Sequence, residues 1–226
     1  MTLTTAPYCY TVPRPAVSTA VVIFTIRDRR LTLLLVRRSD GGHEAKWVLP
    51  GGFVREDEDL DASARRKLRE ETGADVYLEQ LYTFGRPGRE PRERVITVAH
   101  YALIPSDKLQ LRAATDAEAV GWFGMDELPD LAFDHSEIVE MAHRRLVAKL
   151  DYSTIAFEFM PELFTLSDLQ EVYEIILRQE LDKRNFRKRV LALEQIEATD
   201  EERRNGAHRP ARLYRVEHPG KLEFIK

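Results

Sequence analysis

A group of charged residues between positions 58 and 71 has the types and spacing for metal or phosphate chemistry. Glu70 and Glu71 follow Lys67 by three and four residues, so on a helix all three side chains project from one surface. Neighbouring carboxylates are the ligands that Mg²⁺ and Mn²⁺ prefer, and these ions bind phosphates. The ammonium of Lys67 can pair with both glutamates and would repel a cation. We therefore expect Glu70 and Glu71 to bind a metal only weakly, if a metal binds there at all.

The residues on either side of this group predict a loop followed by a helix. Gly51 and Gly52 allow a sharp turn and a close approach of a ligand to the backbone. Asp59 is placed to cap a helix that begins near Leu60, and Gly73 is placed to end it. Apolar residues recur at every fourth position between these ends, which predicts a narrow stripe that packs on a sheet.

From Gly52 to Ala74 the chain resembles the Nudix box, G-x5-E-x7-R-E-U-x-E-E-x-G-U, in which U is apolar. Lys67 stands where the box has its first catalytic glutamate, and every other position fits. The resemblance implies that Glu58 and Arg66 brace the helix against the glycine loop. It also implies a fold that binds a nucleoside diphosphate without hydrolysing it, because loss of a general base typically costs about 10²–10⁴ in rate.

Two alternatives to this interpretation of the box remain open. The segment could be an ordinary charged surface helix with a cap at each end. Lys67 could also be tolerated in an active enzyme, with a carboxylate outside the box, such as Glu118, as the general base.

The segments around the box predict strands and one further helix. Alternating and β-branched residues predict strands at 17–27, 31–38, 76–84 and 95–104, and we expect Trp122-Phe123 to close the sheet. Asp134 and Glu137 are spaced as a capping box for a helix that reaches Leu150. His43, His135 and His143 lack the spacing of metal ligands, so we expect them to be structural or exposed.

The segment 85–94 contains four arginines, which could clamp an anion because guanidinium groups bind phosphate oxygens in pairs. A solvated turn is the alternative for any one of these arginines. The residues expected to bind the ligand are Gly51, Gly52, Arg66, Arg92 and Arg94.

The chain changes character near Leu150, which predicts one domain at 1–150 and a second at 151–226. Ser167 and Gln170 are spaced as a capping box for a helix to about Gln179, and a basic amphipathic helix follows at 183–193. Strands at 196–199 and 212–216, with Asn205-Gly206 between them, complete the pattern of a winged helix-turn-helix.

This second region is locally basic. Residues 183–215 contain ten basic and five acidic residues, although the whole chain has a formal net charge of -4. Basic side chains on one helix face predict contacts with DNA, and a merely solvated helix and hairpin are the alternative. The residues expected to contact DNA are Lys183, Arg184, Asn185, Arg187, Lys188 and Arg209.

The composition predicts a soluble cytoplasmic protein. The single cysteine, Cys9, cannot form an internal disulfide, which favours a reducing compartment. The stretch up to Pro15 lacks the apolar region of a signal peptide, and no run reaches the ~18 apolar residues of a membrane span.

Taken together, the two regions resemble the NrtR family, the Nudix-related transcriptional regulators. The resemblance rests on the altered box, on Asp-Lys-Arg-Asn-Phe-Arg-Lys at 182–188 and on Arg-Pro-Ala-Arg-Leu-Tyr at 209–214. It implies an α+β protein: a Nudix fold, with a mixed β-sheet between helices, followed by a winged helix-turn-helix.

The same resemblance implies a function. Members are bacterial homodimers that bind palindromic operators in double-stranded DNA, usually repress genes of NAD or sugar metabolism, and sense ADP-ribose or a related nucleotide. No cofactor would be required, and a role for Mg²⁺ stays open. The rival interpretation is an active ADP-ribose pyrophosphatase whose C-terminal domain only aids dimerisation.

Overall fold

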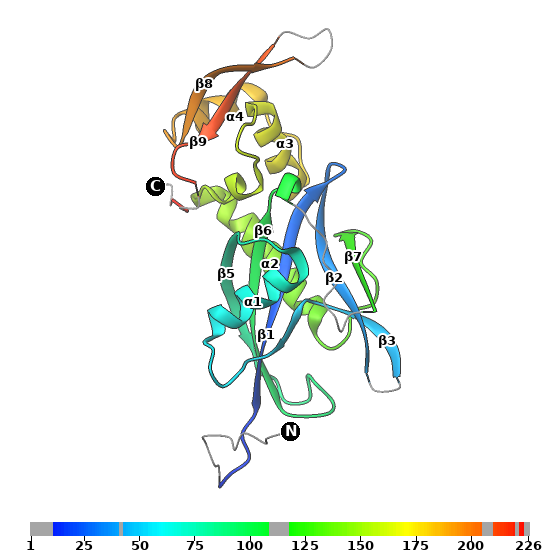
Figure 1. Ribbon diagram of the computed structural model, residues 1–226. Coiled ribbons are helices and arrows are strands. Elements are labelled where there is room, and N and C mark those ends of the chain that lie inside the picture. Colours follow the sequence, from blue (N-terminus) through cyan, green and yellow to red (C-terminus); the bar gives the residue numbers. More distant parts are fainter. Residues whose placement is uncertain (1–10, 41–42, 109–117, 205–209, 220–221, 224–226) are drawn as a thin grey trace.

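The chain forms a mixed sheet with a helix on each face, followed by a small helical domain with a two-stranded wing (Figure 1). The computed structural model describes residues 11–40, 43–108, 118–204, 210–219 and 222–223. In the described residues, no helix is long and apolar enough to cross a membrane.

Within the described residues the sheet contains seven strands, and its main path runs β3-β2-β1-β6-β5, with β4 paired to β1 and β7 paired to β2. Strands β1 and β6 are parallel, and the other pairings are antiparallel. Strands β1 and β2 form a hairpin with a tight turn at Asp28 and Arg29. The strands are β1 (Ala16–Arg27), β2 (Arg30–Asp40), β3 (His43–Val48), β4 (Gly51–Phe53), β5 (Tyr77–Phe84), β6 (Val95–Ile104) and β7 (Ala119–Gly124).

Two helices cover opposite faces of this sheet. Helix α1 (Leu60–Thr72) packs Ala64 and Leu68 against one face, and α2 (His135–Tyr152) packs its apolar side against the other. As predicted, Asp59 caps α1, because its carboxylate accepts a hydrogen bond from the backbone N–H of Ala62 at 2.7 Å. Gly73 ends the helix in a left-handed conformation with φ 68°. The predicted Nudix sandwich is therefore confirmed.

The C-terminal part has the predicted winged-helix arrangement. The short 3₁₀ helix η1 (Ser106–Lys108) lies between β6 and β7, and a second one, η2 (Ile155–Phe159), follows α2. The C-terminal part then contains α3 (Leu166–Leu177), α4 (Lys183–Leu191), β8 (Ile196–Arg203) and β9 (Ala211–Val216). Strands β8 and β9 form the wing, which continues further along β8 than predicted. The predicted tip, Asn205-Gly206, lies outside the described residues.

The capping box expected at Ser167 and Gln170 is wrong. Thr165 is the N-cap of α3: its hydroxyl accepts from the N–H of Asp168, and the Asp168 carboxylate accepts from the N–H of Thr165. The helix therefore begins at Leu166, whose side chain is buried, and ends at Leu177 rather than near Gln179. A start at Ser167 would leave that apolar residue outside the helix.

The capping box expected at Asp134 and Glu137 is also wrong. Helix α2 does begin at His135, but the Asp134 side chain makes no capping hydrogen bond. Its carboxylate instead accepts two hydrogen bonds from the buried guanidinium of Arg89, and Glu137 pairs with Arg86. A buried charge needs a partner more than an exposed backbone N–H does, which explains the difference.

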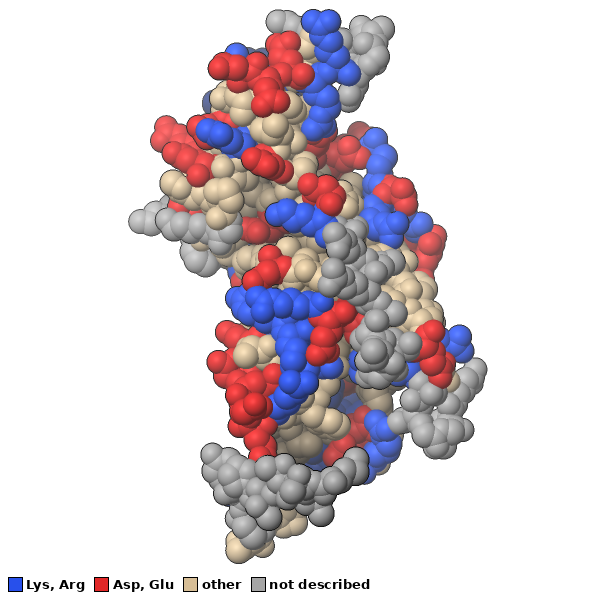
Figure 2. Space-filling view, in the orientation of Figure 1, with Lys and Arg blue, Asp and Glu red and all other residues tan. Residues whose placement is uncertain are grey.

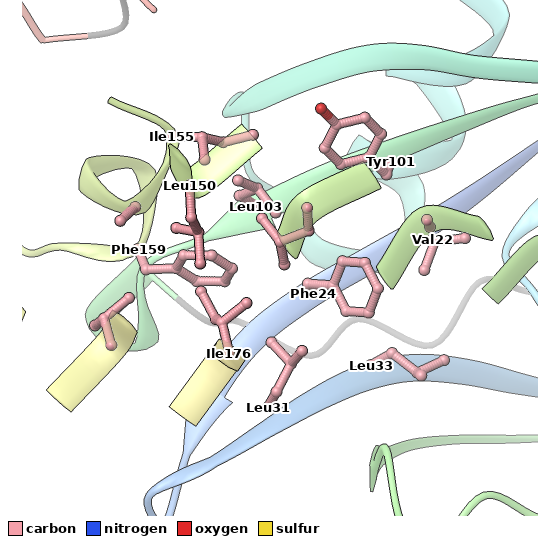
Figure 3. Packing of buried hydrophobic residues seen from close by; sticks show 14 of the residues in the cluster. Val22, Phe24, Leu31, Leu33, Tyr101, Leu103, Leu150, Ile155, Phe159 and Ile176 are labelled. Carbon is pink, nitrogen blue, oxygen red and sulfur yellow. The ribbon is translucent and has the colours of Figure 1, made fainter. Parts of the chain in front are cut away.

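One hydrophobic core extends through both parts of the chain (Figure 3). Phe24 and Leu31 of the sheet lie near Phe159 of η2 and Ile176 of α3, and all four side chains are almost fully buried. Helix α2 runs through residue 150, where the sequence predicts a domain boundary, and ends at Tyr152. The shared core joins the winged helix to the sheet within one chain.

Candidate functional site

The charged residues of the altered box form ion pairs on and around α1. The ammonium of Lys67 lies 2.8 Å from a carboxylate oxygen of Glu70, and its aliphatic stem lies against Gly52. Glu71 is fully buried and forms an ion pair with Arg38, with the nearest atoms 3.7 Å apart. The predicted pairing of Lys67 with Glu70 is thus present, whereas Arg38 of β2 is a partner of Glu71 that the sequence did not reveal.

Arg66 and Glu58 brace the helix start as the resemblance implies. Arg66 donates to both oxygens of Glu58, at 2.9 and 2.5 Å, and also to Glu70 at 3.2 Å. The hydrogen bond from Arg66 lowers the pKa of Glu58 to about 2. Burial raises the pKa of Glu70, but hydrogen bonds from Lys67 and Arg66 outweigh it, so that pKa is lowered. Both glutamates are therefore ionised and already neutralised by cations of the fold.

The glycine loop borders a cavity of about 720 Å³, a size typical of a site for a nucleotide-sized ligand. Strands β1, β4 and β6, the loop 89–92 and the turn 132–135 all contribute to its lining. A side chain at Gly51 would collide with the backbone of Thr19 at 2.4 Å, so only glycine allows this close pairing of β4 with β1.

The predicted ligand residues divide into two groups. Gly51, Gly52 and Arg92 line the cavity, and Arg92 is more than half exposed while it pairs with Glu90. Arg66 and Arg94 do not line it. Arg66 is held by the two glutamates, and the guanidinium of Arg94 donates to the carbonyl oxygens of Gly85 and Val95.

Several other residues that line the cavity were not predicted from the sequence. Arg38 and Lys46, paired across β2 and β3, add positive charge, and the exposed rings of Phe53 and Phe133 add aromatic surface. His135 also lines the cavity, although the sequence predicted only a structural or exposed histidine. Glu118, the alternative general base, is exposed before β7 and is not among the lining residues. Within the described residues, no group of histidine, cysteine or carboxylate side chains could hold a metal ion.

A second candidate site lies on α4. Phe186 and Val190 are buried, which turns the opposite side of the helix to solvent. All five DNA-contact residues predicted on this helix are exposed. Four basic side chains there form no ion pair with any described residue: Lys183, Arg184, Arg187 and Lys188. The sixth predicted residue, Arg209, lies outside the described residues.

Some other basic residues of this domain have structural contacts. Arg203 pairs with Asp168, and Arg215 pairs with Glu197 across the wing. Arg189 of α4, although exposed, lies over the ring of Tyr173 and donates to the carbonyl oxygen of Leu150 at 3.0 Å. The face in Figure 2 likewise shows Lys and Arg interspersed with Asp and Glu from the wing to the sheet. The unpaired cations of α4 thus differ from most of the surface.

Comparisons with family models match both parts of the chain. Residues 16–142 match the model described as the NUDIX domain. Residues 156–216 match the model described as the NrtR DNA-binding winged helix domain.

Comparisons with individual proteins extend over most of the chain. It is 39% identical over 208 residues to the ADPR responsive transcriptional repressor NtrR of Acinetobacter baylyi, which covers 90% of this chain and 82% of that protein. The structure of Shewanella oneidensis NrtR complexed with a 27mer DNA has a TM-score of 0.80 and 36% identity, over 89% of this chain and 93% of that one. The NUDIX domain of the same NrtR complexed with ADP ribose has a TM-score of 0.53 and 35% identity, over 60% of this chain and 90% of that one.

Proposed function

The chain belongs to the NrtR family, and from that premise we propose that it is a transcriptional repressor of genes of NAD-related or sugar metabolism. In this proposal residues 1–150 sense ADP-ribose or a related nucleotide, and residues 151–226 bind DNA. The relative from Acinetobacter, which is named as ADPR-responsive, supports the effector. The Shewanella structures, one with DNA and one with ADP ribose, support both partners.

Helix α2 is the single observation that carries this proposal. At the start of α2, His135 lines the cavity, and Asp134 accepts a hydrogen bond from Arg89, which is another residue of the cavity lining. At its end the carbonyl oxygen of Leu150 accepts a hydrogen bond from Arg189 of α4. With 18 residues at about 1.5 Å each, the helix is roughly 27 Å long. A shift of α2 on ligand binding would therefore reach the helix that carries the unpaired cations.

DNA binding would use a homodimer and a palindromic operator. Two α4 helices must lie about 34–36 Å apart to enter successive major grooves. The shared core within one chain favours movement of whole subunits over bending between the two domains. A ligand that prefers a dimer with another spacing would weaken DNA binding by its differential affinity for the two states.

We also propose that the protein does not hydrolyse its effector and needs no metal to bind it. Lys67 takes the position of a catalytic carboxylate, and Glu70 and Glu71 are neutralised by Lys67, Arg66 and Arg38. The cations Arg38, Lys46 and Arg92 around the cavity suit the phosphates of the ligand directly.

Two titrations of the purified wild-type protein test the proposal. Calorimetry with ADP-ribose should show binding in the presence of a chelator, and chromatography of the ligand should show it uncleaved. Fluorescence anisotropy should show binding to DNA from upstream of the protein's own gene. Turnover of ADP-ribose without any DNA binding would instead establish the pyrophosphatase.

A further inference from the structure

The turn before α2 contains a bulky residue in a rare backbone conformation. Phe133 has φ 59°, in the left-handed region that phenylalanine seldom adopts. Such conformations persist where surrounding contacts impose them, and they cluster at functional sites. Here the next residue, Asp134, is bonded to Arg89, and the preceding residue, Ala132, donates to the carbonyl oxygen of Trp47 at 2.9 Å. The turn is thus fixed on both sides of Phe133.

This conformation presents the Phe133 ring to the cavity. The ring belongs to neither hydrophobic core and is 41% exposed, although the residue lines the cavity. Its centroid lies 5.4 Å from that of the His135 ring, in an edge-to-face arrangement that restricts its orientation. An exposed, oriented aromatic face is a platform on which a nucleobase can stack.

His135 offers one neutral hydrogen-bond donor beside this ring. Its Nδ1 accepts a hydrogen bond from the backbone N–H of Leu49 at 3.0 Å, so the proton of the neutral ring lies on Nε2. Burial and the nearby Arg89 lower the pKa of His135 to about 4, which keeps the ring uncharged near pH 7. A neutral N–H suits an acceptor on a base, whereas phosphate is better served by the arginines and lysine of the lining.

We propose that Phe133 and His135 form the base-recognition wall of the cavity. The Phe133 ring stacks on the nucleobase of the effector, and Nε2–H of His135 donates to an acceptor atom of that base. This assignment rests on the proposed function, because it specifies which residues select the nucleotide. Arg89 and Asp134 are positioning residues, since they hold the turn.

Two ligands that differ only by the base test this assignment. AMP and ribose 5-phosphate are titrated into the full-length protein, and the ratio of their dissociation constants measures the contribution of the base. Phe133→Asn removes the ring but keeps a residue that tolerates positive φ, and Phe133→Gly is a second variant that adopts it without strain. His135→Asn keeps an acceptor for the N–H of Leu49 but shortens the donor.

We expect the wild type to bind AMP more tightly, and the ratio to fall about tenfold in both Phe133 variants and severalfold in His135→Asn. Tyr82→Leu is the matched control, because Tyr82 is an exposed aromatic residue of β5 that does not line the cavity. Its ratio should match the wild type. Thermal midpoints identify any variant that fails to fold.

The outcomes separate this inference from the proposed function. If the wild type binds ADP-ribose but none of the Phe133 and His135 variants changes the ratio, the base-recognition wall is refuted and the sensor stands. The same holds if Tyr82→Leu lowers the ratio as much as the Phe133 variants do. If the wild type binds no ADP-ribose, the proposed function itself fails.

Discussion

The basic side chains next to the cavity and those on helix α4 differ in whether they form ion pairs. Next to the cavity, Lys67 and Arg66 of α1 and Arg89 of the cavity lining each pair with a carboxylate of the fold. On the outer face of α4, the basic residues have no ion-pair partner among the described residues. Charges that pair within the fold stabilise its shape, whereas unpaired cations can release their counterions and bind a polyanion such as DNA. The cavity is therefore built to fit one small ligand, and α4 to meet many phosphates.

The largest expected effect comes from undoing the neutralisation on α1. Lys67→Glu would place a third carboxylate beside Glu70 and Glu71 and remove the ammonium that repels a cation. We expect Mg²⁺-dependent cleavage of ADP-ribose to rise by about 10²–10⁴ over the wild type. Product formation with and without a chelator measures it. Efficient cleavage by the wild type would contradict the account of Lys67.

Removal of unpaired charge from α4 should be nearly as severe. Arg184→Ala with Lys188→Ala should weaken DNA binding about a thousandfold and reduce its salt dependence, because phosphate contacts are lost in each subunit. Anisotropy at several salt concentrations measures both. The matched control is Arg65→Ala with Arg69→Ala, which removes the same charge from residues paired with Asp75. Equal losses in the two double variants would mean that only net charge matters.

The shared core predicts that the two regions are not independent in stability. Ile176→Ala in α3 should lower the free energy of unfolding by about 2–5 kcal/mol. Both tryptophans, Trp47 and Trp122, lie in the Nudix part, so their fluorescence reports unfolding of that part. The urea concentration at the midpoint of the fluorescence transition should decrease in Ile176→Ala. It should not change in Leu191→Ala, which truncates an exposed residue. An unshifted midpoint in Ile176→Ala would show separately folding domains.

A pH dependence should follow from the neutral His135. Its pKa falls from about 6.5 in the unfolded chain to about 4 in the fold. As the pH falls below 6.5, the unfolded state gains a proton that the folded state does not, so stability decreases until about pH 4. Between pH 7 and 5 the wild type should lose roughly 2 kcal/mol more than His135→Asn, measured by urea denaturation. Equal losses would mean that His135 is charged in the fold.

The smallest effect tests the connection between the two regions. Arg189→Met removes the hydrogen bond to Leu150 but keeps an apolar stem over Tyr173. We expect ADP-ribose affinity to stay within about twofold, while the factor by which ADP-ribose changes DNA affinity shrinks about five- to tenfold. An unchanged factor would assign the connection to other contacts of α2.

Local patterns predicted much of this structure, because the determinants lie close together in the sequence. Asp59, Gly73 and the apolar stripe between them define α1, and alternation defines the strands. The helix-turn-helix followed from one buried stripe, Phe186 and Val190, opposite a basic face. Each of these signals involves residues within a few turns of one another.

The base-recognition wall that we propose, Phe133 and His135, could not be predicted from such local patterns. Arg89 and Asp134 are 45 residues apart, and their contact both removes the expected cap of α2 and places Phe133 in the cavity. Whether an arginine of the loop 85–94 reaches the cavity likewise depends on the loop conformation, which brings Arg92 but not Arg94 to the lining. At α3, Thr165 and Ser167 are both good caps, and only burial of Leu166 decides between them.

The most direct test of the central claim is the linkage between the two ligands of the wild type. DNA from upstream of the gene is titrated with the protein at fixed salt, with no ADP-ribose and at saturation, and ADP-ribose is then titrated with and without DNA. The account predicts that ADP-ribose weakens DNA binding and that DNA weakens ADP-ribose binding by the same factor. If both ligands bind and neither changes the affinity of the other, the protein is not a sensor of this nucleotide.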